Sequence, residues 1–311
     1  MEFGAHLPII AFGGQRPSLA RLASYAEAAE AMGFRILATS DHLLFPRPWL
    51  DGPTALAAVL SRTSRITLAT AVALPAIHGP VALAKALAAV DILSDGRLLV
   101  GVGAGSSPLD FRAAGVPLEE RWKRLEESVR LFRASWSSES QPYRGRFYSI
   151  ERNALQPPPV QQPSGPPIWI GSWGSDAGLR MTARLGDGWL ASASNTTPEK
   201  FAAAWGQLKE HVAGAGKDPA RFPNAISSMF LYITEDRSEA ELVLRTMLGP
   251  TFGRSESEMR QRLLVGPAQE CAEKLAAYRD AGVQRVIVWP VSDELFQLEM
   301  FQARVVPSLA G

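Results

Sequence analysis

The feature that most constrains the fold is the regular alternation of short apolar segments with longer amphipathic ones along most of the chain. Runs rich in apolar and β-branched residues predict eight strands, at residues 3–7, 34–39, 66–72, 98–102, 168–171, 188–192, 225–233 and 284–289. Helical spacing predicts helices at residues 19–32, 53–60, 80–93, 118–136, 176–185, 198–213, 238–264 with a break at Gly249-Pro250, 268–281 and from residue 294. This alternation favours a closed parallel barrel over an open sheet. We therefore predict an α/β fold, a (β/α)8 TIM barrel.

The pattern is interrupted once, at residues 141–167, where prolines and glycines accumulate around the run Pro157-Pro158-Pro159. The same strand and helix rhythm resumes after this segment, so it reads as an irregular insertion and not as a linker between domains. A (β/α)8 barrel typically takes about 250 residues. We expect one domain that spans residues 1–311, with the insertion at about 141–167.

Composition narrows the functional classes. The chain has 32 basic and 31 acidic residues, and 46% of its residues are hydrophobic, which argues against disorder and against nucleic acid as a partner. The longest uncharged stretch, residues 66–84, contains Pro75, Gly79 and Pro80, so no membrane-spanning segment is predicted. The N-terminus lacks the basic and cleavable regions of a secretory signal, and we expect a cytoplasmic protein. The single cysteine, Cys271, is expected in the core.

In a (β/α)8 barrel, the functional groups lie on the loops that leave the carboxyl ends of the strands. The second strand leads directly into Asp41 and His42, a carboxylate beside an imidazole that titrates near neutral pH. The alternative is that both side chains only bond to the loop backbone. We favour a catalytic role for His42.

Three further strand exits supply candidate contacts for a bound ring or phosphate. Ala71 and Val72 end the third strand as an aliphatic wall that can lie under a flat ring, although such residues are most often core. The fourth strand exits through a glycine-rich loop that includes Ala104, Gly105 and Ser106. The fifth exits through Gly171, Ser172, Trp173, Gly174 and Ser175 into a helix at Asp176, where free N–H groups favour a phosphate and an ordinary helix cap is the alternative.

The remaining histidines carry weaker signals. His6 ends the first strand, where it could line the pocket or be a satisfied core residue, His78 reads as structural, and His211 lies on a helix surface. The sequence has none of the clustered spacings of a metal site and no GxSxG motif, so we predict no metal.

Taken together, several strings of this sequence resemble the bacterial luciferase-like monooxygenase superfamily and, within it, the oxidoreductases that use the deazaflavin coenzyme F420. The strings are Gly33-Phe34, Ser40-Asp41-His42, residues 66–72, Ala84-Lys85, residues 93–97, residues 101–105, residues 167–171 and residues 186–189. Their order and spacing together are specific to the superfamily, and the match covers most of the chain.

The resemblance implies a barrel that binds an isoalloxazine-like ring at its mouth and a phosphate in the loop before Asp176. By position, it places a non-proline cis peptide between Ala71 and Val72, behind the ring. It gives Asp41 and His42 contact with the ring, with His42 as proton donor or acceptor. It also points to homodimers. One departure is Ser106, which stands near the place of an acidic residue in the sugar-phosphate dehydrogenases of this group.

The leading hypothesis is therefore an F420-dependent oxidoreductase that transfers a hydride between the deazaflavin and a small organic substrate. One alternative is an FMN-dependent monooxygenase, whose reduced flavin comes from a separate flavin reductase. The other is a flavin-binding protein without catalytic activity. The sequence does not identify the substrate.

Overall fold

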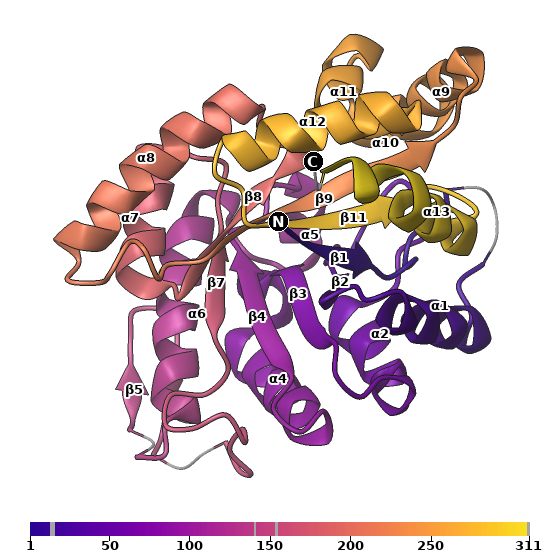
Figure 1. Ribbon diagram of the computed structural model, residues 1–311. Helices are drawn as coiled ribbons and strands as arrows, with labels where there is room; N and C mark the ends of the chain where they lie inside the picture. The colour runs from indigo at the N-terminus through magenta and orange to yellow at the C-terminus, as the bar shows by residue number, and fades with distance from the viewer. Residues whose placement is uncertain (13–15, 140, 153–154, 310–311) are drawn as a thin grey trace.

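The barrel is closed by eight parallel strands in the computed structural model, which describes residues 1–12, 16–139, 141–152 and 155–309 (Figure 1). The strands are β1 (Glu2–His6), β2 (Ile36–Thr39), β3 (Thr67–Ala73), β4 (Leu98–Gly103), β7 (Ile168–Gly171), β8 (Gly188–Ser192), β9 (Asn224–Ile233) and β11 (Arg285–Pro290). Each pairs in parallel with both neighbours, and the pairing of β1 with β11 closes the ring. The predicted (β/α)8 barrel is confirmed.

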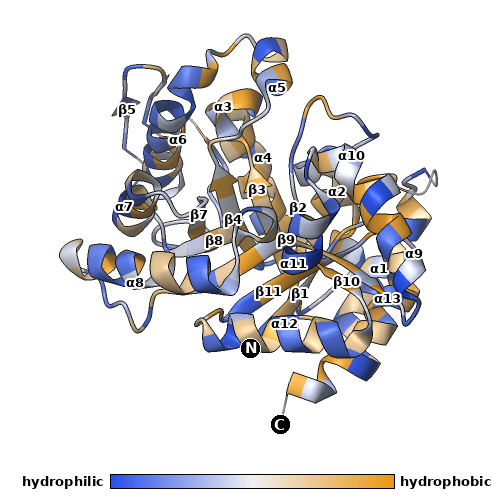
Figure 2. Ribbon diagram, turned by 90° about the horizontal axis from the view of Figure 1, so that it is seen from above, coloured by the Kyte–Doolittle hydropathy of each residue, from blue (hydrophilic) through white to orange (hydrophobic). Residues whose placement is uncertain are grey.

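Helices surround the barrel on its outer side, as Figure 1 shows, and Figure 2 gives the same elements seen from above. The longer helices are α1 (Leu19–Ala31), α2 (Gly52–Ala58), α4 (Pro80–Leu93), α6 (Arg121–Trp136), α7 (Asp176–Leu185), α8 (Pro198–Gly214), α12 (Ala268–Asp280) and α13 (Glu294–Met300). Two short helices follow strand exits, α3 (Pro75–His78) after β3 and α5 (Pro108–Ala113) after β4. The sequence did not predict these two helices.

The region predicted as a helix at residues 238–264 is more divided than expected. It contains α9 (Arg237–Val243), a π-helical turn (Leu244–Leu248), α10 (Gly249–Phe252) and α11 (Glu256–Arg262). The predicted break at Gly249-Pro250 is misplaced, because Pro250 lies in the first turn of α10, where no N–H is needed. The chain instead breaks after α10 at Gly253, whose φ of 61° is left-handed. A further short strand, β10 (Leu264–Gly266), then pairs with β9.

The described part of the predicted insertion contains one β-hairpin. Two short antiparallel strands, β5 (Tyr143–Arg144) and β6 (Ser149–Ile150), form a hairpin beside α6. Most of the other described residues in this segment are turns and bends. Residues 153–154 of the insertion and the last two residues of the predicted domain lie outside the described part of the chain.

Small residues control how the barrel interior is filled. The interior cluster includes four alanines together with Trp169, and the alanines are Ala38, Ala69, Ala71 and Ala225. Gly188 makes room for the indole of Trp169, because a Cβ there would lie 2.5 Å from the ring. Trp169 of β7 thus fills part of the barrel interior, and the four alanines around it occupy little volume.

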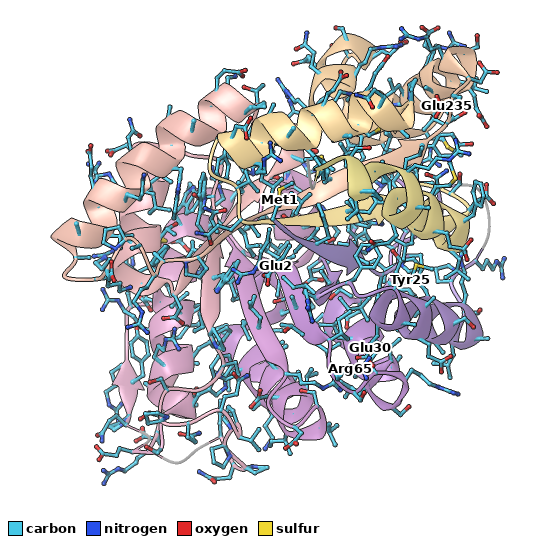
Figure 3. The ribbon with its side chains drawn as sticks, in the orientation of Figure 1. Met1, Glu2, Tyr25, Glu30, Arg65 and Glu235 are labelled. Carbon is cyan, nitrogen blue, oxygen red and sulfur yellow. The ribbon has the colours of Figure 1, made fainter. Side chains whose placement is uncertain are left out.

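One carboxylate ties the first helix to the entry of β3. Glu30 of α1 accepts hydrogen bonds from the backbone N–H groups of Ser64, Arg65 and Ile66, and Figure 3 shows Glu30 beside Arg65. Burial of the carboxylate favours its neutral form. These hydrogen bonds outweigh burial and lower the pKa of Glu30 to about 2.

Two further predictions concern Cys271 and membrane-spanning segments. Cys271 is fully buried in α12, as predicted. Among the residues that the structure describes, no helix has both the length and the apolar character needed to cross a membrane.

Candidate active site

A cavity of about 460 Å³ opens at the carboxyl ends of the barrel strands. Most of the predicted site residues line it, namely Asp41, His42, Ala71, Val72, Ala104, Gly105, Ser106, Gly171, Ser172 and Trp173. Gly174 lines a smaller neighbouring cavity, on which Ser172 and Trp173 also border. Ser175 lines neither cavity, because its hydroxyl caps α7 by accepting a hydrogen bond from the N–H of Gly178.

The imidazole of His42 is held by a carboxylate that the sequence analysis missed. His42 Nδ1 lies 2.7 Å from Oδ2 of Asp110, and Asp110 Oδ1 accepts a hydrogen bond of 2.7 Å from the N–H of Leu44. The Asp110 side chain is fully buried, whereas that of His42 is 24% exposed. When Nδ1–H donates to the carboxylate, Nε2 is left without a partner among the described residues, so it can exchange a proton with a ligand in the cavity.

Local structure brings Asp110 to this place. The Ser107 hydroxyl caps α5 by accepting from the N–H of Asp110, which fixes the first turn of that helix. The rings of Phe45 and Trp49 pack against the other sides of the imidazole, with centroids 4.7 Å and 4.8 Å away. Hydrogen bond and packing together hold the His42 ring in one orientation.

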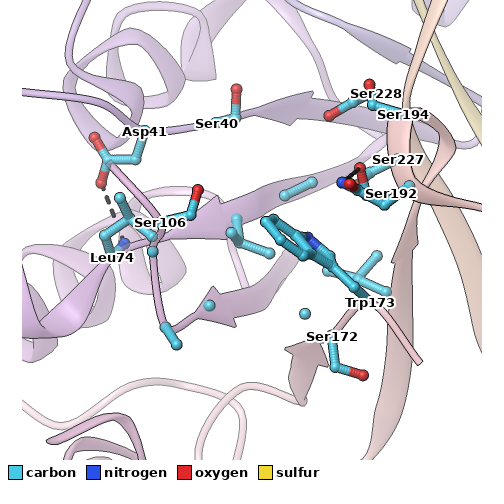
Figure 4. Close-up of a pocket in the computed structure, with 18 of the residues that line it drawn as sticks. Ser40, Asp41, Leu74, Ser106, Ser172, Trp173, Ser192, Ser194, Ser227 and Ser228 are labelled. Atoms are coloured by element: carbon cyan, nitrogen blue, oxygen red, sulfur yellow. Dashed lines mark hydrogen bonds between the residues drawn. The ribbon is translucent and has the colours of Figure 1, made fainter. Parts of the chain in front are cut away.

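Asp41 belongs to a second histidine–carboxylate pair. Its Oδ2 lies 2.6 Å from Nε2 of His78, although the two groups are poorly aligned for a hydrogen bond, and it accepts a long hydrogen bond from the N–H of Leu74 (Figure 4). Asp51 lies 3.9 Å from the same nitrogen. The side-chain contact with Asp41, partly offset by burial, raises the pKa of His78. His78 therefore acts as a counter-charge for the buried Asp41 carboxylate.

The floor of the cavity is the end of β3. The peptide bond between Ala71 and Val72 is cis, as the family resemblance implied. The side chain of Val72 lies over two glycines of the neighbouring strands, since a Cβ at Gly103 would be 2.6 Å and one at Gly171 would be 2.8 Å from its methyl groups. Absence of these two Cβ atoms gives Val72 the space to form an aliphatic shelf.

His6 is a core residue and does not line the cavity. Its ring stacks on Trp289 at 3.4 Å, Nδ1 lies 2.9 Å from the carbonyl oxygen of Leu7, and Nε2 lies 3.1 Å from the hydroxyl of Ser40. Burial, partly offset by the contact with Leu7, lowers the pKa of His6 to about 3. The neutral imidazole supports Trp289 and Ser40, which do line the cavity.

The sequence analysis also missed the polar wall opposite Asp41. It is formed by side chains from β8, from the turn after β8, from β9 and from the segment before α11, and its members are Ser192, Ser194, Asn195, Ser227, Ser228 and Arg254. We call these residues the serine wall. No motif links them, and the tertiary structure alone brings them together.

Fold and site together define a barrel enzyme with an imidazole and an aliphatic shelf at its mouth. The sequence matches the family of luciferase-like monooxygenases over residues 1–257, and the chain belongs to this family. It is accordingly an oxidoreductase of the luciferase-like type.

Two relatives and one solved structure extend this comparison. The F420-dependent hydroxymycolic acid dehydrogenase of Mycobacterium tuberculosis is 28% identical over 315 residues, covering 93% of this chain and 84% of that protein. The F420-dependent glucose-6-phosphate dehydrogenase of Kineococcus radiotolerans is 30% identical over 231 residues, covering 71% and 66%. An F420-dependent secondary alcohol dehydrogenase, solved with an F420-acetone adduct, has a TM-score of 0.86 over 99% of this chain and 98% of that chain. At 18% identity, that structure shows the shared fold.

Proposed function

We propose that this protein is an F420-dependent oxidoreductase that transfers a hydride between the deazaflavin and a small organic substrate. The observation that carries the proposal is His42, held by Asp110 at the edge of a cavity whose floor is the Val72 shelf. The names of both relatives support F420 as the cofactor.

The residues present fit a flat tricyclic ring. The cis peptide and the glycines at positions 103 and 171 give the floor its shape, and Val72 can support one face of a ring. The loop from Gly171 to Gly174 borders the two cavities just before the N-terminus of α7, where a phosphate would be held. Asp41 and His42 border the same space.

In this proposal, the protein supplies orientation and proton transfer. The bound deazaflavin would donate or accept the hydride, which is chemistry that no side chain provides. His42 Nε2 would give a proton to the substrate oxygen or take one from it, and Asp110 would hold the imidazole in the required tautomer. Phe252, Phe230 and Trp289 would exclude water from the reacting carbon.

Cofactor titration tests the proposal. Purified protein is titrated separately with F420 and with FMN, and binding is followed by the absorption and fluorescence of each cofactor. We expect F420 to bind about tenfold more tightly than FMN, or better, and a tenfold ratio corresponds to about 1.4 kcal/mol of binding free energy. Tight binding of FMN without binding of F420 would overturn the proposal in favour of the FMN-dependent monooxygenase. Binding of either without turnover of any substrate would favour the non-catalytic alternative.

The family resemblance supports three further parts of the proposal. We propose that the chain folds as one domain, acts as a homodimer, and works in the cytoplasm. Sedimentation velocity of the purified protein measures its oligomeric state, and a monomer at micromolar concentration would contradict the homodimer.

A further inference from the structure

The serine wall lies at the exits of strands that supply none of the proposed cofactor contacts, although Ser192 and Asn195 also border the smaller cavity beside Gly174. The proposed contacts come from the exits of β2, β3, β4 and β7, whereas the wall comes from β8, β9 and the segment before α11. Figure 4 shows Ser192, Ser194, Ser227 and Ser228 grouped on one side of the cavity, with Asp41 and Ser106 on the other and Trp173 between them.

Arg254 gives this wall a positive charge. Its guanidinium donates to Oδ1 of Asn195, and no carboxylate in the described part of the chain lies within ion-pair distance of it. The nearby Arg260 and Arg262, in contrast, each have a carboxylate partner in α9 or α11. Glu258 is close enough for its charge to interact with that of Arg254 but does not contact it. A half-buried guanidinium that faces a cavity with no carboxylate in direct contact favours an anionic ligand.

The neighbouring hydroxyls are held so that they can donate to the same ligand. Arg262 donates to the carbonyl oxygen of Ser194 at 2.8 Å, which fixes the turn that carries Ser194 and Asn195. The hydroxyls of Ser194 and Ser228 have no hydrogen-bond partner among the described residues, although both serines line the cavity.

The backbone of β9 is irregular where it reaches the wall. Ser228 has a φ of 56°, a left-handed conformation that is uncommon for a residue other than glycine. The register between β9 and β11 shifts at the same level, between Val286 and Val288. Such bulges redirect side chains and are frequent beside active sites. Here the bulge accompanies two consecutive serines that both border the cavity.

The acidic groups lie on the opposite side and already have partners. Asp41 is paired with His78, and Asp110 is paired with His42. The cavity therefore has one side whose carboxylates are paired and a hydroxyl-rich side that carries Arg254. A second guanidinium at the cavity, that of Arg121 at the start of α6, donates to the carbonyl oxygen of Leu118.

From this arrangement, and on the basis of the proposed function, we propose that the substrate carries an oxyanion that binds to Arg254 and the serine hydroxyls. A carboxylate, a sulfonate or a phosphate has the required chemistry. With the oxyanion at the wall, the remainder of the substrate extends toward His42 and the Val72 shelf, where the reacting carbon would lie.

Small anions test the wall without knowledge of the substrate. Acetate, methanesulfonate and methyl phosphate are titrated into the protein by calorimetry, with neutral acetamide as the control ligand. The variants are Arg254→Met and a matched control, Arg245→Met. Arg245 is an exposed arginine of the π-helical turn that lines neither the active-site cavity nor its smaller neighbour. Ser228→Gly is a second variant, because glycine accepts the left-handed backbone and removes only the hydroxymethyl group.

We expect at least one anion to bind to the wild type and to R245M, with no binding of acetamide. R254M should weaken the binding of that anion about tenfold or more, since it removes the charge-assisted hydrogen bonds to the oxyanion. S228G should weaken the binding several-fold. The affinity for F420 should stay within about twofold of the wild type in R254M.

Three results would overturn this inference: none of the anions binds, R254M binds them as tightly as the wild type, or R254M loses affinity for F420 instead. The last result would assign the wall to the phosphate of the cofactor. The anions are titrated in the absence of any cofactor. If F420 failed to bind, the proposed function would be refuted, but the anion titration would still test the serine wall.

Discussion

At the scale of single residues, the proposed proton transfer depends on the pair of His42 and Asp110, because the 2.7 Å contact between Nδ1 and the buried carboxylate leaves Nε2 available to a ligand in the cavity. His42 could be predicted because it directly follows a strand, where barrel enzymes place functional groups. Asp110 could not, because it lies 68 residues away in α5, a six-residue helix too short to show a periodic pattern. The pairing of Asp41 with His78 was missed for the same reason. Contacts between distant loops are set by the closure of the barrel.

Replacement of His42 and of Asp110 should separate chemistry from positioning. His42→Ala should lower kcat by about 10²–10⁴-fold, the usual contribution of a general acid or base, with F420 affinity retained. Asp110→Asn keeps the side-chain volume but presents an N–H to Nδ1, which favours the wrong tautomer. The Asp110→Asn variant should therefore have a lower kcat and a nearly unchanged KM.

The control for this pair is Asp280→Asn, at the exposed end of α12, which should leave kcat unchanged. Steady-state kinetics at saturating F420, with thermal unfolding measured alongside, give these numbers. Wild-type kcat in H42A would exclude the acid–base role. A D110N variant that changes only KM or only the unfolding temperature would reduce Asp110 to a structural residue.

The buried His6 makes stability depend on pH. The unfolded chain binds a proton at His6 below about pH 6.5, whereas the folded protein does so only near pH 3. The unfolded state therefore binds more protons between these values, and the free energy of unfolding should fall as the pH is lowered through this range. Urea unfolding at pH 7 and pH 5 measures this slope. His6→Gln should reduce the slope, and an equal slope in H6Q and the wild type would contradict the assignment.

At the scale of elements, the local sequence pattern was sufficient to predict where an element begins and ends when the segment is long or is bounded by clear signals. The bounds of α4, β7, α7 and β8 agree with the sequence prediction. The segment from residue 238 to 264 differs because a proline was read as a helix breaker although it lies in a first turn, and because β10 is only three residues long. The hairpin of β5 and β6 was also too short to be recognised.

The close contact between Val72 of β3 and Gly103 of β4 predicts that a second substitution can restore stability lost by a first. Gly103→Ala should destabilise the protein by about 1–3 kcal/mol, the usual cost of overpacking, because the new methyl group would meet Val72. Val72→Ala in the same chain removes that clash, so the double variant should recover most of the loss. Chemical unfolding of the wild type, both single variants and the double variant completes the cycle. Additive losses would show that Val72 does not lie over Gly103.

At the scale of the whole molecule, closure of the barrel assembles the site. The pairing of β1 with β11 brings the two ends of the chain together, so that residues from β2 to β11 border one cavity. The alternation of strands and helices was enough to predict this architecture. The serine wall was not predictable, since its members come from three separate segments, residues 192–195, 227–228 and 254, whose meeting depends on the closed ring.

The most direct measurement is a crystal structure of the protein with F420 bound. The account predicts a deazaflavin ring that lies on the Val72 shelf, with His42 beside the reacting edge of the ring and the serine wall left free on the far side. A ring bound elsewhere, or one whose phosphate occupies the wall around Arg254, would contradict it.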